Sequence, residues 1–401
     1  MSIEMLLVML MSTSVFDMLP FQEFFASNNT FTYLLLMMAY LYMKYMGFSF
    51  RPGIQRHLTP LVLIAASMFL SFIPAYLYYG QHLYHSLVVY RRALVLLFYP
   101  LLLSICPTVK ECRAAFFAYG FIYAIFSFLG TYVHPEWVKV TDGMENIITN
   151  DLLKALPGLH FVVFSLIFAL EQYRSTFRRK YLLMAIFYFV VIFLAKNRTI
   201  LLASVLVITC SVLFGLKLRT RVVAEILLVV FFLALLVLGW TYISELLERT
   251  FLQLQDDDYN RVKAFNYFIA AKNGPLSVFL GNGFISGNVS SIMDDLRHEG
   301  IYNSDLGLIG LWHQFGLLFP LTVLYYAFRG FSRDHVFHVR AMSVMMFACT
   351  MTMAYFFTFG SMIWLCFFLY FSATDQEYYD ARDERKERIA KQSVRKYRSL
   401  I

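Results

Sequence analysis

The sequence predicts an all-α polytopic membrane protein with about twelve transmembrane helices. Its 401 residues are 59% hydrophobic and include 42 Phe and 27 Tyr, and their mean hydropathy is +0.61. Apolar runs of about 20 residues, the length that a helix needs to cross a bilayer, recur along the chain. A single run can be a buried helix of a soluble protein, but so many in one chain argue against a soluble fold.

These runs define the expected spans in order. The first begins beside Glu4 and has no basic stretch before it, so we interpret it as a helix and not as a cleaved signal peptide. The spans are expected at 4–20, 31–49, 58–79, 87–106, 113–133, 157–173, 181–196, 200–216, 222–243, 306–328, 341–357 and 359–374.

Basic residues are divided unevenly between the two alternating sets of connections. One set and the C-terminal tail carry most of them, and positively charged loops remain in the cytoplasm. Both termini are therefore expected to be cytoplasmic, and the net charge of +8 reflects topology and not nucleic-acid binding. The basic residues of the short loops in this set are Arg51, Arg56, Lys110, Arg113, Arg174, Arg178, Arg179, Lys180, Lys217, Arg219, Arg221, Arg329, Arg333 and Arg340.

We expect a single transmembrane domain over 1–374 and a charged cytoplasmic tail over 375–401. The only extended hydrophilic connection, 244–305, falls on the outer side. Apolar residues at helical spacing predict short interfacial helices within it, and the Gly281-Asn-Gly283 sequence predicts a turn. One large outer loop on a helical bundle favours a site at one membrane face.

No metal or other cofactor is expected. The five Cys all lie in predicted helices or at their cytoplasmic ends, which argues against disulfides and thiolate metal sites. The acidic run 256–258 is interpreted as a solvated turn, because adjacent carboxylates do not converge on one point.

Four arginines at the outer face are candidates for binding an anion. Arg198 lies at the outer junction of two spans, Arg91 and Arg92 are expected to begin another helix, and Arg261 lies in the large loop. The guanidinium group makes bidentate, charge-assisted hydrogen bonds to phosphate. Interfacial anchoring is the plainer interpretation of Arg91, Arg92 and Arg198, and a local ion pair is the plainer one of Arg261.

Two residues just before the span at 306–328 are candidates for general bases. His298 and Asp305 would lie at the depth of a lipid headgroup, where either could activate an acceptor hydroxyl. A surface polar group is the plainer interpretation of each residue alone. His313, inside the next helix, is explained by a position facing the bundle interior.

Together these residues suit the transfer of a glycan from a polyprenyl pyrophosphate carrier. Arginines can stabilise a departing pyrophosphate without a metal, and a hydroxyl nucleophile needs only a positioned base.

The chain resembles the O-antigen ligase/polymerase superfamily, membrane-embedded glycosyltransferases of the GT-C class in bacterial envelopes. The resemblance covers about 190–325, and the N-terminal half matches only in hydropathy. It is carried by Arg198 in Asn-Arg-Thr, Arg261, Gly281-Asn-Gly283, Asn303-Ser-Asp305 and Gly316 eleven residues later. The ligase branch has a His at the entry to this helix where the present chain has residues near Asp305, which favours the polymerase branch.

This resemblance implies an O-antigen or lipopolysaccharide polymerase in a bacterial inner membrane. It would join undecaprenyl-pyrophosphate-linked repeat units at the periplasmic face, by inversion and without a nucleotide sugar. Arg198 and Arg261, with Arg91 or Arg92, would bind pyrophosphate, and Asp305 or His298 would activate the acceptor. Partners would be the lipid-linked oligosaccharide, membrane lipid and a possible chain-length regulator.

Two alternatives remain open. An O-antigen-type ligase would need a His at the helix entry. A lipid-oligosaccharide flippase or other transporter would predict internal repeats, charges deep within helices and helix pairs broken at Gly or Pro.

Overall fold

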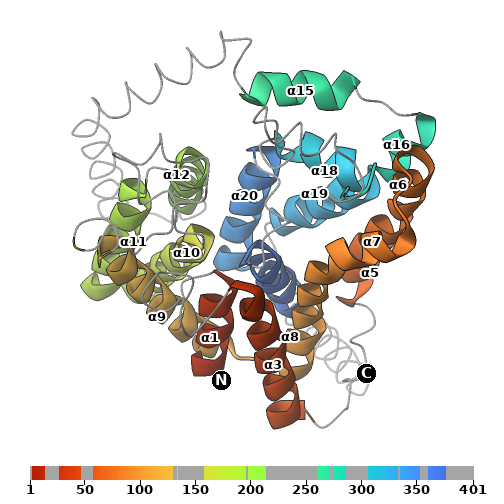
Figure 1. The fold of residues 1–401 in the computed structure, drawn as a ribbon. Coiled ribbons are helices and arrows are strands. Elements are labelled where there is room, and N and C mark those ends of the chain that lie inside the picture. The colour runs from red at the N-terminus through yellow and green to blue at the C-terminus, as the bar shows by residue number, and fades with distance from the viewer. Residues whose placement is uncertain are drawn as a thin grey trace, which may run out of the picture.

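A computed structural model describes most of the chain. The described residues are 2–13, 27–46, 57–129, 133, 158–195, 197–213, 260–270, 274–285, 306–332, 335–352 and 360–375. Every regular element in these ranges is a helix, which confirms the all-helical prediction there (Figure 1).

The helices follow one another as short and long segments. They are α1 (Ser2–Ser12), α3 (Ser27–Met46), α5 (Thr59–Leu70), α6 (Phe72–Tyr79), α7 (Leu83–Tyr90), the 3-10 helix η2 (Arg91–Leu97), α8 (Phe98–Ile105), α9 (Val109–Phe128), α10 (Leu159–Thr176), α11 (Arg179–Leu194), α12 (Arg198–Leu213), α15 (Asn260–Ala270), α16 (Pro275–Leu280), α18 (Leu308–Phe315), α19 (Leu318–Gly330), α20 (Phe337–Thr352) and a last helix over 360–375.

Two described helices are long and apolar enough to cross a membrane. Thr59–Tyr79 has 21 residues and combines α5 and α6, and Leu83–Ile105 has 23 residues and combines α7, η2 and α8. Shorter apolar helices lie at Ser2–Ser12, Thr199–Ser211 and Phe337–Met351. The predicted span at 222–243 and most of the predicted loop at 244–305 lie outside the described residues.

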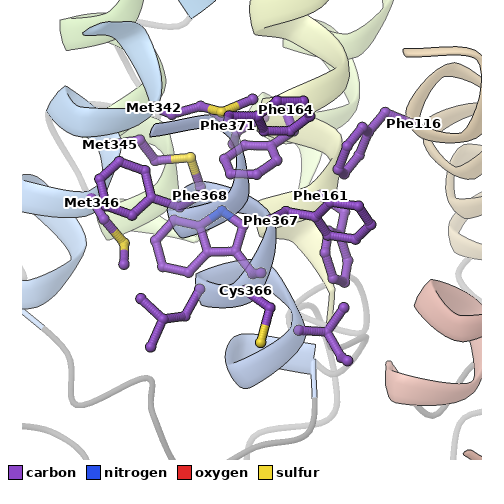
Figure 2. Packing of buried hydrophobic residues seen from close by; sticks show 14 of the residues in the cluster. Phe116, Phe161, Phe164, Met342, Met345, Met346, Cys366, Phe367, Phe368 and Phe371 are labelled. Atoms are coloured by element: carbon purple, nitrogen blue, oxygen red, sulfur yellow. The ribbon is translucent and has the colours of Figure 1, made fainter. Parts of the chain in front are cut away.

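The core is centred on α10 and the helix over 360–375. All residues of α10 from Leu159 to Leu170 are buried, because a helix that is apolar on every side is stable only when neighbours surround it. Aromatic rings fill the space between these helices and α9. Phe116 lies edge-on to Phe367 at 4.9 Å between ring centroids, with Phe161 and Phe164 beside them (Figure 2).

α20 divides the bundle into two groups of helices. It packs against α12 and α10 on one side and against α19 and α18 on the other (Figure 1). Two buried histidines link the start of α20 to neighbouring helices. His335 Nδ1 lies 2.7 Å from Asp375 Oδ2, and His338 Nδ1 lies 2.7 Å from Glu171 Oε1. These contacts join α20 to the last helix and to α10.

Most predicted boundaries differ from the structure by a few residues or more, and two of the differences bear on the site. The helix expected at 87–106 begins at Leu83, so Arg91 lies eight residues inside it and not at its start. The span expected at 306–328 is divided into α18 and α19 at Gly316. Both differences occur where the candidate functional site is built.

Candidate functional site: a glycine turn at an interrupted helix

The interruption between α18 and α19 leaves backbone groups without helical partners. Gly316 has φ 70°, a left-handed conformation that ends α18. The next N–H, that of Leu317, donates to Phe279 O at 3.1 Å and not to a carbonyl of its own helix. The carbonyls of His313 and Gln314 are thereby released from the helical pattern.

The Gly281-Asn-Gly283 turn supplies the missing partners. Asn282 N–H donates to His313 O at 2.7 Å, and Gly283 N–H donates to Gln314 O at 2.8 Å. Irregular backbone is tolerated in an apolar setting only where its polar groups are paired in this way. The turn therefore completes the interrupted helix.

This close pairing requires glycine on both sides. A Cβ on Gly281 would lie 2.3 Å from Gly316 N, and a Cβ on Gly316 would lie 2.0 Å from Phe279 O. Both residues also have positive φ, and this backbone conformation is strained in residues that carry a side chain. The contact of these two backbones therefore requires Gly281 and Gly316. Gly283 has a different cause, because a Cβ there would lie 2.9 Å from Ala75 Cβ and 3.0 Å from Ser71 O.

A chain of hydroxyls joins the turn to α7 and to the junction between α5 and α6. Phe284 N–H donates to the Tyr90 hydroxyl at 3.0 Å, and Tyr90 lies 3.0 Å from Ser71 Oγ. Ser71 uses its one proton to donate to Met68 O at 2.7 Å, so Tyr90 donates to Ser71. The turn is thus held by two helices that lie some two hundred residues earlier in the chain.

Gln81 makes a second connection on the same side. Its buried side-chain amide donates to Phe284 O at 3.1 Å and to Ser86 Oγ at 2.9 Å. Gln81 lies between the two helices that are long enough to cross a membrane. The turn therefore contacts the connection between those helices as well as their interior faces.

Arg91 and Arg92 directly follow Tyr90. They open η2, a 3-10 segment inside the long helix, and both side chains are exposed. A 3-10 stretch within a helix often marks a functional hinge or local strain. The structure thus brings the segment bearing Arg91 and Arg92 to the glycine turn, through the residue before them.

A polar cluster lies on the other side of the turn. Asn282 Nδ2 lies 2.9 Å from His313 Nε2, and the Phe268 ring of α15 lies edge-on to the His313 ring at 4.6 Å between centroids. Arg261 lies in the first turn of α15. The helix that carries Arg261 therefore contacts the same cluster.

Three buried side-chain atoms, on Asn282 of the turn and on His313 and Gln314 at the end of α18, have no hydrogen-bond partner within the described parts of the chain, and we call these three residues the polar cluster. They are Asn282 Oδ1, His313 Nδ1 and Gln314 Oε1. The relative exposure is 2% for Asn282, 8% for His313 and 5% for Gln314. A buried polar atom without a partner costs about 1–3 kcal/mol, so the cluster is a candidate binding site.

Of the remaining predicted site residues, the structure describes only Arg198. Arg198 is the first residue of α12, behind Asn197, whose Oδ1 accepts from Ile200 N–H at 3.1 Å. α12 packs against α20, which also contacts α18. His298 and Asp305 lie outside the described residues, so their predicted role as bases stays a prediction.

Sequence reasoning missed Asn282, Gln314, Tyr90 and Gln81, and it treated His313 as an ordinary interior residue. The Gly281-Asn-Gly283 motif was the available signal for Asn282. Nothing local in the sequence marks the other residues, because their partners lie far away along the chain.

Within the described ranges, no three His, Cys, Asp or Glu side chains gather into a group able to hold a metal ion. Comparison with models of known protein families and with curated protein sequences gives no match to this chain.

Proposed function

We propose that the protein is a polysaccharide polymerase of a bacterial inner membrane that joins undecaprenyl-pyrophosphate-linked repeat units at the periplasmic face. The observation that carries the proposal is the hydrogen bond from Phe284 N–H to the Tyr90 hydroxyl. It connects the glycine turn, which follows Arg261 in the sequence, to the helix that carries Arg91 and Arg92. The proposal assigns these cationic groups, from two distant segments, to one pyrophosphate site.

The proposed topology has about twelve spans with both termini in the cytoplasm. This topology is supported by hydrogen bonds between residues that it assigns to the same face of the membrane. Lys44 Nζ donates to Glu4 Oε1 at 2.5 Å, and the Tyr370 hydroxyl donates to Pro107 O at 2.6 Å, both among residues assigned to the cytoplasmic side. Gln81 and Phe284, which are also paired, are both assigned to the outer side.

In the proposed reaction, the arginines bind the pyrophosphate of the donor and stabilise the negative charge that develops as it departs. Arg91, Arg92 and Arg261 have this role, with Arg198 from α12. Asp305 or His298 accepts the proton of the acceptor hydroxyl, which attacks the anomeric carbon from the opposite side. The anomeric centre is inverted, and the released product is undecaprenyl pyrophosphate.

Two other functions are compatible with the same membrane face. A ligase would use the same donor but a different final acceptor. A lipid-oligosaccharide transporter is favoured by one observation: the helices of the site are interrupted, by Gly316 between α18 and α19 and by η2 within the long helix.

The glycans of a deletion strain distinguish these functions. The strain is complemented with wild type, Arg91→Ala, Arg92→Ala, Arg198→Ala or Arg261→Ala, each at matched protein level. Arg178→Ala, an exposed residue assigned to the cytoplasmic face, is the matched control. A polymerase predicts single repeat units on the final acceptor in the deletion strain and in the outer-face variants, with long chains in the control.

Other outcomes would replace the proposal. Long polymer that stays on the carrier lipid would identify a ligase. Repeat units that accumulate on the cytoplasmic leaflet would identify a transporter.

A further inference from the structure

The unpartnered atoms of the cluster form a defined hydrogen-bonding pattern. Asn282 Nδ2 can only donate, so His313 Nε2 accepts, and the neutral ring carries its proton on Nδ1. The unpartnered buried atoms are therefore one donor, His313 Nδ1–H, and two acceptors, Asn282 Oδ1 and Gln314 Oε1, and the Gln314 amide adds two N–H donors.

This pattern favours an uncharged ligand group over an anion. A phosphate or carboxylate offers only acceptors and would face two carbonyl oxygens. A sugar hydroxyl or an acetamido group can donate and accept at the same site. A buried site that hydrogen-bonds such a group discriminates strongly against a ligand that lacks it, because the polar atoms of the site are then left unpaired.

The cluster also lies beside the proposed pyrophosphate site. The turn that carries Asn282 is bonded through Phe284 to Tyr90, the residue before Arg91. On the other side, Phe268 of α15 contacts His313. A ligand that places its pyrophosphate near the arginines would have its first sugars near the glycine turn.

We propose that Asn282, His313 and Gln314 bind a hydroxyl or acetamido group of the glycan on the lipid carrier. This inference rests on the proposed function. The arginines hold the charged part of the donor, and the cluster recognises its neutral sugar. The three atoms are buried, and the turn is fixed by its bonds to His313 O and Gln314 O, so α15 must move to admit the sugar.

The test compares two lipids on the full-length protein in lipid nanodiscs. One is the undecaprenyl-pyrophosphate-linked repeat unit purified from host cells, and the other is undecaprenyl pyrophosphate without sugar. Binding of each is measured by native mass spectrometry. The variants are Gln314→Met, which keeps the side-chain length, and Asn282→Ala. The control is Thr350→Val, since this buried hydroxyl donates to Met346 O of its own helix.

We expect wild type and Thr350→Val to bind the glycan-bearing lipid more tightly than the bare lipid. Gln314→Met should reduce this preference about tenfold, the effect of one buried hydrogen bond of about 1.4 kcal/mol, with binding of the bare lipid unchanged. If Asn282→Ala fails to fold, the result for Gln314→Met alone decides whether the cluster recognises the glycan.

Two results would overturn the inference, and they are distinguishable. Equal binding of both lipids by wild type, or a preference that Gln314→Met leaves intact, means that the cluster does not recognise the glycan. The proposed donor would then still stand. Failure of wild type to bind either lipid would overturn the proposed function, and this inference with it.

Discussion

The Tyr90 hydroxyl accepts a hydrogen bond of 3.0 Å from the backbone N–H of Phe284, 194 residues later in the chain. The same ring lies edge-on to Phe72 at 4.9 Å and to Phe315 at 5.9 Å between centroids. One side chain therefore connects the long helix with Arg91 and Arg92 to α6, to the glycine turn and to α18.

Tyr90→Phe should separate the hydrogen bonds from the ring packing. The ring contacts are kept, and the bonds to Phe284 and Ser71 are lost. We expect a loss of about 1–2 kcal/mol in stability and shorter glycan chains in complemented cells. Thermal unfolding in detergent and the glycan profile measure the two effects.

Tyr188→Phe is the control for a general effect on stability. It removes a hydroxyl that donates to Phe117 O, in the contact between α9 and α11. Equal glycan profiles for both variants would contradict a role for Tyr90 in the site.

Gly316→Ala should prevent correct folding of the α18–α19 junction. Its Cβ would lie 2.0 Å from Phe279 O, and its φ of 70° is strained for any side chain. Gly80→Ala is a matched control, because Gly80 also has positive φ, 66°, but a Cβ there meets no atom within 4 Å. We expect a cost of about 1–2 kcal/mol at Gly80 from strain alone and little folded protein for Gly316→Ala. Fluorescence-detected size-exclusion chromatography in detergent compares the two, and similar yields would contradict the close contact.

Asp375→Ala should loosen the beginning of α20. Asp375 Oδ2 lies 2.7 Å from His335 Nδ1 and accepts from Val336 N–H at 3.0 Å, and removing it leaves both donors buried or half-buried without this partner. We expect a loss of about 1–3 kcal/mol in thermal stability. Thr374→Val is the neighbouring control, since that hydroxyl donates within its own helix to Tyr370 O. An equal shift in both variants would show that the Asp375 contacts contribute nothing specific.

Glu111 should contribute a small pH-dependent stabilisation of α9. Its carboxylate accepts hydrogen bonds from the Thr108 N–H at 2.9 Å and hydroxyl at 2.8 Å, and these bonds hold its pKa below the usual range. Because the pKa is lower in the folded state, the stabilisation is present above the usual carboxyl pKa of about 4.3 and is lost as pH falls through the lowered pKa. Thermal unfolding of wild type and Glu111→Gln should differ at pH 6 and converge in acid. A difference that grows in acid would contradict this sign.

Residue-by-residue properties accounted for the helical fold of the described chain. The apolar runs predicted the long helix over Thr59–Tyr79 to within a residue at its start. They failed at Gly316, where the apolar run continues through the interruption. Hydropathy measures only the preference of each residue for an apolar environment, and it is blind to a backbone that leaves the helix while remaining buried.

The candidate site was anticipated only where a local signal existed. The sequence predicted a turn at Gly281-Asn-Gly283 and anion-binding candidates at Arg91 and Arg92. The connection between them could not be anticipated, because it depends on a contact between Tyr90 and Phe284 that no local pattern encodes.

By itself, the sequence determined that the chain is helical and rich in apolar segments, because both properties are sums over neighbouring residues. The tertiary structure alone decided that the glycine turn completes an interrupted helix and that Asn282, His313 and Gln314 form one cluster. Those relationships arise from backbone hydrogen bonds between segments about thirty residues apart, at 2.7 Å and 2.8 Å, and such bonds form only when the bundle brings the segments together.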